Sequence, residues 1–254
     1  PEQTNLRQFS ATAAFREGIL DLPVPFPLHH GGELAAPRLA WRLAGDSCLP
    51  IVLAIGGISA HRRVCDELQP HTGWWREVAG PGRALDSVRC CILGIDYLGG
   101  WGDSTGVPQH ADLPSISSYD QALALRCLFD HLGIARLRAI VGASYGGMVG
   151  LAFAERYPER LSRLLVISAA DRTHPMATAW RCVQRRTVRF AMQQGRASEG
   201  LELARALAMA TYRSPEEFSA RFAAPPERTD ARFVFPVEAY LFARGRDYAA
   251  RVQP

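Results

Sequence analysis

The chain has 254 residues, of which 48% are hydrophobic and 21% charged, a composition typical of a soluble globular protein that buries a sizeable core. No apolar stretch approaches the roughly 20 residues that a transmembrane helix needs, and the N-terminus lacks a signal-peptide pattern, so the sequence predicts no membrane association. The net charge of +4 is small and dispersed, and it does not indicate nucleic acid as a partner.

The predicted elements alternate in type along the chain. The first ~45 residues are typical of antiparallel strands, with a proline-spaced extended stretch at 23–27 and a strand at 38–43. We then expect buried strands at 50–55, 90–95, 137–141 and 164–167, and helices at 118–131 (capped by Ser117 or Ser118, with Gly133 past its end) and from Tyr145 to Tyr157. Strands that are apolar on both faces and alternate with helices predict an α/β fold with a mostly parallel sheet.

The pattern changes after Ser168. From Asp171 to about Gly245 the periodicity is helical, with no convincing series of strands. We therefore expect a core at 1–168 followed by a helical lid at 169–254, the alternative being a helical tail that packs elsewhere on the sheet. Three arginines share one face of the first lid helix and are more typical of a solvated surface than of an anion site: Arg181, Arg185 and Arg189.

The cysteine and histidine patterns predict neither disulfides nor a metal site. Its six cysteines form no CxxC pair and no disulfide framework, and most sit in apolar surroundings. We therefore expect reduced, buried thiols and a cytoplasmic protein. The histidines are scattered without ligand spacing, so the sequence predicts no metal site.

The segment from Ala139 to Met148 carries the strongest functional signal. An apolar strand leads directly into Gly-x-Ser-x-Gly, and a helical pattern follows, which is typical of a nucleophile elbow that presents Ser144 in a strained, exposed conformation. We expect a Cβ atom at Gly142 or Gly146 to collide across the turn. An ordinary strand–helix turn that happens to contain this motif is the alternative.

A nucleophilic serine needs two N–H donors where negative charge develops on the attacked carbonyl. The N–H of Tyr145, directly after the serine, is one candidate. The second normally comes from the loop after an earlier strand, where Gly56 and Gly57 precede Ile58, so we expect the Ile58 N–H to be the other donor. A simple tight turn would explain the two glycines equally well.

Four landmarks follow one another along the chain. They are residues 73–75 with 80–86, residues 98–106, residues 141–148, and residues 210–214 with Phe218, Arg221 and Phe222. In this order they resemble the GWW…GPGKALDT block, the LGG…GSTG loop, the VGxSxGGM elbow and the TYRS…F…RF lid signature of one family, the homoserine O-acyltransferases of the α/β-hydrolase fold. The resemblance covers nearly the whole chain. It implies an α/β-hydrolase fold with a helical lid, and similar sequences include acetyltransferases, homoserine succinyltransferases and serine succinyltransferases.

The resemblance also implies a reaction. Ser144 would take the acyl group from succinyl-CoA or acetyl-CoA and pass it to the hydroxyl of L-homoserine in methionine biosynthesis, with no permanently bound cofactor. The family's substrate-binding arginine and tyrosine appear at the positions of Arg205 and Tyr212. Guanidinium suits a carboxylate, and a phenol donates a directed hydrogen bond. A homodimer formed through the lid helices is also implied.

The sequence departs from the family where a general base is needed. The family places its Asp and His on loops beyond the lid, whereas the only histidine after Ser144 here is His174, at the start of the lid. Asp171 with His174, or His61 near the oxyanion loop, are weak substitutes. The simplest explanation is that the C-terminal part of the core is absent from this chain, which would leave an unpaired edge on the sheet.

Three readings therefore remain open: a homoserine or serine O-acyltransferase, a serine esterase of the same fold, and a non-catalytic fragment or degenerate homologue. An esterase would not need the TYRS or GSTG segments. Dehalogenase chemistry is excluded, because it requires an aspartate where this chain has Ser144.

Overall fold

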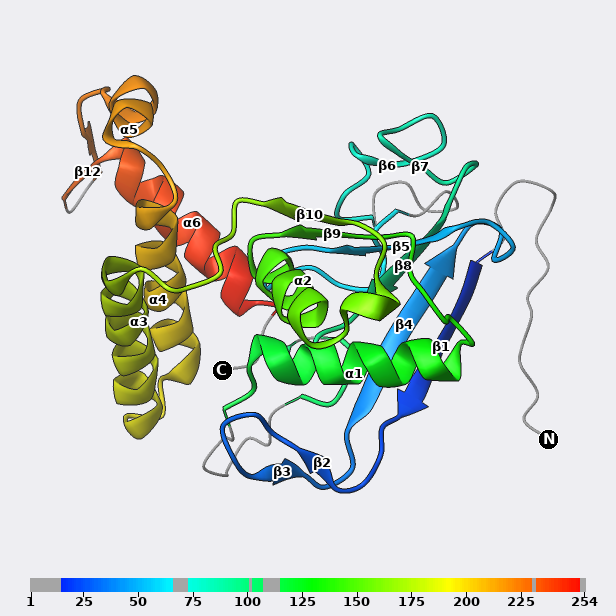
Figure 1. The fold of residues 1–254 in the computed structure, drawn as a ribbon. Coiled ribbons are helices and arrows are strands. Elements are labelled where there is room, and N and C mark those ends of the chain that lie inside the picture. The colour runs from blue at the N-terminus through cyan, green and yellow to red at the C-terminus, as the bar shows by residue number, and fades with distance from the viewer. Residues whose placement is uncertain (1–14, 66–72, 101, 107–114, 230–231, 252–254) are drawn as a thin grey trace. The chain divides into compact units, whose positions relative to one another are not determined.

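The computed structural model describes residues 15–65, 73–100, 102–106, 115–229 and 232–251 (Figure 1). Parts of two expected segments lie outside these residues: the start of the antiparallel region, at 1–14, and Trp101 in the LGG…GSTG loop. The chain divides into two compact units, the first ending at Asp171 and the second beginning at Arg172, and each is described by itself.

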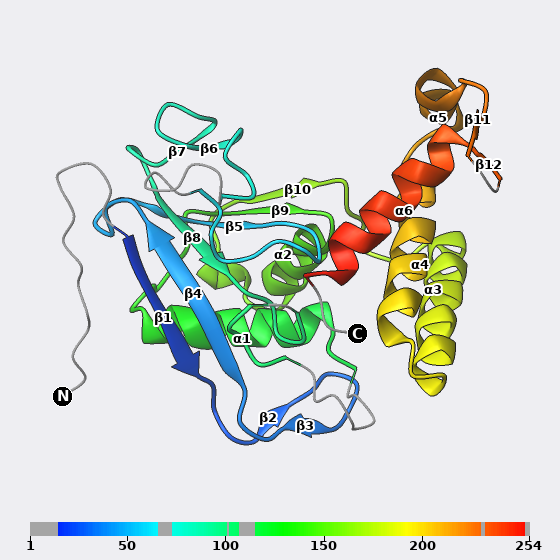
Figure 2. The ribbon, with the colours of Figure 1, turned by 180° about the vertical axis from the view of Figure 1, so that it is seen from behind.

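A six-stranded sheet forms the centre of the first unit (Figures 1 and 2). Its order is β1 (Phe15–Asp21), β4 (Arg38–Ala44), β8 (Cys91–Ile95), β5 (Ile51–Ile55), β9 (Ala139–Ala143) and β10 (Leu164–Ile167). The pairs β1–β4 and β4–β8 are antiparallel, while β8, β5, β9 and β10 run parallel. The expected mostly parallel α/β sheet is confirmed.

The central strands bury both faces, because successive side chains point to opposite sides of the sheet. Leu53 and Leu93 belong to the larger hydrophobic cluster, which includes buried residues of helices α1 (Ser118–His131) and α2 (Tyr145–Arg156). Their neighbours Ala54 and Ile92 belong to a second cluster, with residues from the segment between β5 and β8. Two-sided burial explains why these strands are continuous apolar runs.

The predicted boundaries hold well in the core. Helix α1 matches its predicted range; Ser117 is its N-cap, its N–H donating to the Asp120 carboxylate at 2.6 Å, and Gly133 follows the helix at φ 69°. The elbow strand was predicted two residues too early, because Leu137 makes only an isolated bridge with Leu161. Helix α2 ends at Arg156, and the 3₁₀ turn Pro158–Arg160 follows.

Short pairs complete the first unit. Strands β2 (Phe26–Pro27) and β3 (Glu33–Leu34) are antiparallel, and β6 (Ala79–Gly80) and β7 (Leu85–Asp86) are parallel. Strand β10 is the last strand of the sheet among the described residues, and on it Leu165 is 54% exposed.

The second unit is mainly helical, as its periodicity predicted. It contains α3 (Pro175–Gln193), α4 (Ala197–Thr211), α5 (Pro215–Phe222), α6 (Pro236–Ala249) and a short pair, β11 (Glu227–Arg228) with β12 (Phe233–Val234). Helix α4 packs against both α3 and α6. Glycines permit the close approach: a Cβ on Gly200 would lie 2.5 Å from that of Ala191, and one on Gly245 would lie 2.6 Å from the Glu202 carbonyl oxygen.

One expectation about side chains needs correction, that of buried thiols, and the surface of α3 adds a second finding. The six cysteines are free, but only Cys65 and Cys91 are buried, whereas Cys48 lies in an exposed turn and Cys182 on the outside of α3. No residue of α3 is fully buried, so its apolar residues Val183, Phe190 and Met192 are as exposed as its arginines. Periodicity locates a helix but does not say which of its faces finds a partner.

Candidate active site

Ser144 stands at the junction of β9 and α2 in a backbone conformation that side chains rarely adopt. Its φ is 54° and its ψ is −120°, and the residue is exposed. Its own N–H donates to the Ile167 carbonyl of β10 at 2.9 Å, which anchors the turn to the neighbouring strand. Such a conformation costs about 1–3 kcal/mol and persists only where the surroundings enforce it. The strained and exposed conformation expected of Ser144 is confirmed, while its role as the nucleophile stays a prediction.

The flanking glycines make this turn possible. A Cβ on Gly142 would lie 2.6 Å from the Gly146 carbonyl carbon, and one on Gly146 would lie 2.6 Å from the carbonyl carbon of Ile55. These are backbone atoms that no rotamer change can move away. The predicted collision across the turn is confirmed for Gly142, whereas a Cβ on Gly146 would collide with the end of the neighbouring strand β5. Gly147, which the motif did not single out, is equally constrained, because its Cβ would lie 2.6 Å from that of Ala169.

The loop after β5 comes directly beside the serine. A Cβ built on Gly57 would lie 3.9 Å from the Ser144 Oγ, so this glycine leaves the approach to the hydroxyl open. The carbonyl of Gly56 accepts the Gly146 N–H at 2.8 Å, which joins this loop to the elbow. Within the described part of the chain, neither the Ile58 N–H nor the Tyr145 N–H donates to another protein group.

Tyr145 presents its phenol to the interior rather than to a substrate. Its ring meets that of Tyr97 edge-on, with the centroids 5.0 Å apart. Burial raises the pKa of Tyr145 to about 12. The phenol is therefore neutral near pH 7 and does not act as a general base there, which leaves the backbone N–H as the group that this residue can offer.

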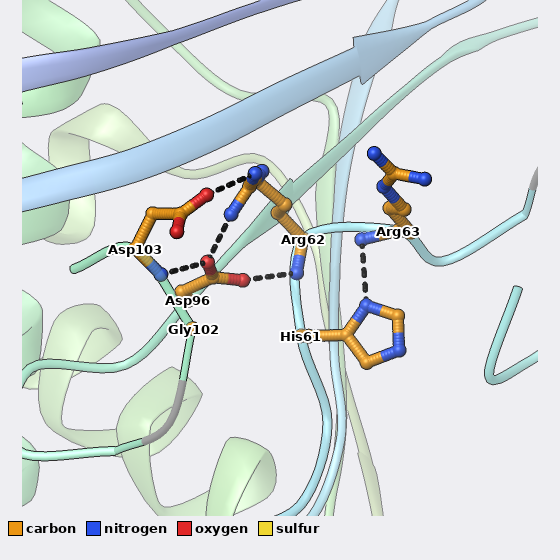
Figure 3. A pocket seen from close by; sticks show the side chains of 6 residues that line it. All are labelled: His61, Arg62, Arg63, Asp96, Gly102 and Asp103. Carbon is orange, nitrogen blue, oxygen red and sulfur yellow. Dashed lines mark hydrogen bonds and ion pairs between the residues drawn. The ribbon is translucent and has the colours of Figure 1, made fainter. Parts of the chain in front are cut away.

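A pocket of about 250 Å³ lies against the continuation of the same loop (Figure 3). It is lined by His61, Arg62, Arg63, Asp96, Gly102 and Asp103. Asp96, only 1% exposed, accepts the Arg62 N–H at 2.7 Å and the Asp103 N–H at 3.0 Å, and also pairs with the Arg62 guanidinium. Sequence reasoning missed this network, although a charged residue directly after a buried strand was an available signal.

No general base is visible at Ser144 in the part of the chain that the structure describes. Among the described residues no histidine is hydrogen-bonded to Ser144. The pKa of His61 is lowered, chiefly by burial, and its Nδ1 accepts the Arg63 N–H at 3.2 Å. His174 is the N-cap of α3, with its Nδ1 accepting the Met176 N–H at 3.2 Å. Both rings are engaged in local backbone contacts, so neither is held as a base.

In the second unit Arg205 lies between two aromatic rings. Its guanidinium carbon is 5.8 Å from the ring centroid of Tyr212, at the end of α4, and 4.7 Å from that of Tyr248, on α6. In the region that the structure covers, Arg205 has no carboxylate partner. A cation held by aromatic faces while its N–H groups stay unused is suited to an incoming anion. The sequence named Arg205 and Tyr212 but missed Tyr248.

The described residues contain no group of three or more His, Cys, Asp or Glu side chains arranged to hold a metal ion. In the same residues, no helix is both long enough and apolar enough to pass through a membrane. The described residues therefore hold two candidate sites. One consists of Ser144, Tyr145 and the Gly57–Ile58 loop in the first unit, and the other of Arg205 with Tyr212 and Tyr248 in the second unit.

Comparison with known proteins gives a consistent result. Residues 50–226 match the model of the alpha/beta hydrolase fold family. The chain is 44% identical to a homoserine O-succinyltransferase of Xanthomonas campestris, over 91% of this chain and 60% of that protein. It is 33% identical to a serine O-succinyltransferase of Frateuria aurantia, over 92% of this chain and 71% of that protein.

Among solved structures, a homoserine O-acetyltransferase from Staphylococcus aureus superimposes with a TM-score of 0.77 at 21% identity, over 94% of this chain and 68% of that one. At this identity the likeness shows the fold alone. The chain spans 60% of the length of the Xanthomonas relative, so it corresponds to part of that protein.

Proposed function

Because the chain belongs to the alpha/beta hydrolase fold family, in the group that contains the homoserine and serine O-acyltransferases, we propose that the full-length protein transfers an acyl group from acyl-CoA to the hydroxyl of L-homoserine, a step of methionine biosynthesis. One observation carries this proposal: Ser144 stands strained and exposed on an elbow, in a chain 44% identical to a homoserine O-succinyltransferase. The conformation of Ser144 supports its role as the nucleophile, and the sequence identity to a homoserine O-succinyltransferase supports acyl transfer as the reaction.

In the first half-reaction the Ser144 Oγ attacks the thioester carbonyl. Its proton passes to a general base, and the oxyanion accepts hydrogen bonds from the N–H groups of Ile58 and Tyr145. When the tetrahedral intermediate collapses, the C–S bond breaks and the CoA thiol leaves, which forms an acyl ester on the serine. In the second half-reaction the hydroxyl of the amino acid attacks this ester, and the serine regains its proton.

The base and its orienting acid belong, in this proposal, to the part of the full-length protein that residues 1–254 do not include. Two observations support this. No described histidine contacts Ser144, and the chain spans only 60% of the Xanthomonas relative. The helical second unit would then be a lid inserted before the remainder of the core.

Arg205 and Tyr212 are proposed to hold the amino-acid substrate. A guanidinium with no carboxylate partner among the described residues can pair with the substrate carboxylate through two parallel hydrogen bonds. Tyr212 is 62% exposed, so its hydroxyl is accessible to a small polar molecule.

We propose succinyl-CoA as the donor, because both sequence relatives compared above are succinyltransferases. Acetyl-CoA remains the alternative donor. Serine is the second candidate acceptor, favoured by the 33% identity to a serine O-succinyltransferase. The protein would need no bound cofactor, and we place it in the cytoplasm, where acyl-CoA is made.

A homodimer is part of the same proposal, formed through α3. Its exposed apolar residues recur at helical spacing: Met176, Trp180, Val183 and Phe190, which are 58%, 41%, 51% and 64% exposed. An apolar stripe of this kind on one helix is typical of a surface that pairs with another copy.

The test is release of free CoA by the full-length protein, given succinyl-CoA or acetyl-CoA with homoserine, with serine, or with no acceptor. We expect release from succinyl-CoA that depends on homoserine. Release that depends on serine alone would identify the second candidate. Equal release without an acceptor would identify a hydrolase, and no release with either donor would mean that the protein is not an acyltransferase.

A further inference from the structure

The loop after β5 has a demanding task in the proposed reaction, because it must hold one N–H group at a fixed point beside Ser144. It begins with Gly56 and Gly57, which restrict the backbone least of all residues. Ile58, which follows them, is 51% exposed, so its side chain anchors the loop weakly. Something outside the loop must therefore set its position.

Tyr97 forms a hydrogen bond to the first residue of this loop. Its Oη donates to the Gly56 carbonyl at 2.7 Å, and the same carbonyl accepts the Gly146 N–H from the elbow at 2.8 Å. Since the C=O of one residue and the N–H of the next lie in one rigid plane, two donors on this oxygen fix the Gly56–Gly57 peptide. The backbone leading into Ile58 is thereby oriented relative to the nucleophile turn.

The phenol of Tyr97 is well suited to this role. The residue is only 4% exposed, and burial raises its pKa far above the usual range, so the hydroxyl keeps its proton at any working pH. Its ring packs edge-on against that of Tyr145, the residue that carries the other oxyanion N–H. Tyr97 therefore contacts both sides of the proposed oxyanion site without facing the substrate.

Asp96, which precedes Tyr97 in the chain, forms hydrogen bonds to Arg62 at the other end of the same loop. Its Oδ1 accepts the Arg62 N–H at 2.7 Å, and its Oδ2 pairs with the Arg62 guanidinium (Figure 3). The Asp103 N–H, at 3.0 Å from Oδ2, joins the loop after β8 to the same carboxylate. Gly102 is required at this contact, since a Cβ there would lie 2.6 Å from the carboxyl carbon.

We propose that Asp96 and Tyr97, at the carboxyl end of β8, are a pair of positioning residues that hold the 56–62 loop by its two ends and so aim the Ile58 N–H at the oxyanion. This inference rests on the proposed serine acyl transfer. It assigns a role in acylation to two residues that contact neither substrate nor nucleophile. Two residues at the end of β8 thereby set the position of the loop that follows the neighbouring strand β5.

Tyr97→Phe in the full-length protein is the primary test, because it removes one hydroxyl and keeps the ring. The Gly56 carbonyl still accepts the Gly146 N–H, so no buried acceptor is left without a donor. We expect the rate of Ser144 acylation, by p-nitrophenyl acetate and by acyl-CoA, to fall about tenfold, as for loss of one buried hydrogen bond. The KM for homoserine should be unchanged.

Tyr119→Phe is the matched control, since it also removes a phenol that donates to an acceptor, here Glu155 at the surface. Its acylation rate should equal that of the wild type. Asp96→Asn removes the negative charge that pairs with the Arg62 guanidinium. This variant should also slow acylation and leave the KM for homoserine unchanged. Each rate is divided by the concentration of folded protein and is measured at a temperature well below the unfolding midpoint of that variant.

An acylation rate of Tyr97→Phe equal to that of the wild type would overturn the inference. So would a change in the KM for homoserine with no change in the acylation rate. The ester reaction needs no amino-acid acceptor, which separates the two proposals. If the wild type is acylated by the ester but transfers nothing to homoserine or serine, the proposed function fails while the Tyr97 comparison remains decisive.

Discussion

The two candidate sites, one in each unit, are built by different means. At the elbow the proposed functional element is the backbone: a serine at φ 54°, glycines close to carbonyl groups, and N–H groups of Ile58 and Tyr145 that have no acceptor among the described residues. In the second unit the proposed functional element is a side chain, Arg205, which lies on a regular helix between the rings of Tyr212 and Tyr248. The first depends on a conformation, and the second depends on which helices pack together.

This difference predicts how each part responds to change. A backbone site tolerates almost no substitution at its glycines, because the clashing atoms belong to the main chain. A side-chain site on a helix tolerates substitution structurally, because α4 retains its small buried residues Gly200, Ala204, Ala206 and Ala208. We therefore expect elbow variants to lose catalysis or folding outright, and variants of the second unit to lose affinity or assembly.

The largest effect is expected from Ser144→Ala. Removing the nucleophile should lower turnover by at least about 10⁴-fold, because the acyl-enzyme can no longer form. The circular dichroism spectrum should be unchanged. Ser162→Ala, an exposed serine before β10 at the opposite end of the sheet, is the control. Turnover of Ser144→Ala at the wild-type rate would refute the mechanism.

Gly146→Ala tests the backbone side of the comparison by stability. Its Cβ would overlap the Ile55 carbonyl and lie 2.8 Å from the Gly56 oxygen. We expect a loss of about 3 kcal/mol in the free energy of unfolding, measured by urea titration. Gly106→Ala is the control, since a Cβ there would lie 4.0 Å from the Gly100 carbonyl oxygen, its nearest neighbour among the described residues apart from the adjoining ones in the chain. A loss of the same size in both variants would mean that the turn is not uniquely constrained.

Arg205→Ala tests the side-chain part. Removing the guanidinium should raise the KM for the amino acid roughly 100-fold, the value of a charged hydrogen-bonded pair, and leave acylation by acyl-CoA unchanged. Steady-state and single-turnover kinetics together separate the two steps. Arg196→Ala, which loses an exposed ion pair with Glu199 near the start of the same helix, should change neither. Slower acylation in Arg205→Ala would contradict the assignment.

The smallest effect is expected at the surface of α3. Phe190→Glu places a charge in the exposed stripe and should weaken the proposed homodimer roughly tenfold without unfolding the helix. Light scattering over a range of concentrations measures this directly. Val88→Glu, which alters a residue that is 68% exposed in the first unit, is the control. A dimer that resists Phe190→Glu would place the interface elsewhere.

Much of the core was predictable from local pattern. The range of α1, the parallel strands and the strain at Ser144 follow from two-sided apolar runs, cap residues and glycine spacing, which act within a few residues of one another. The exposure of Cys182 and of the apolar residues of α3 was not predictable. Periodicity shows that a helix has an apolar face, but only packing decides whether that face is covered.

The sequence by itself determined the tight turn at Gly142, because a Cβ there would clash with the backbone of Gly146 and Gly147 in the same turn. The requirement for glycine at position 146 comes from the tertiary structure, because a Cβ there would clash with the Ile55 carbonyl of the neighbouring strand β5. Only the tertiary structure decided which residues form hydrogen bonds to the loop that carries Ile58. Tyr97 reaches the Gly56 carbonyl across 41 residues of sequence, and Asp96 reaches Arg62 across 34. Such contacts exist because β5 and β8 are neighbours in one sheet, and strand order is a long-range property that no local pattern encodes.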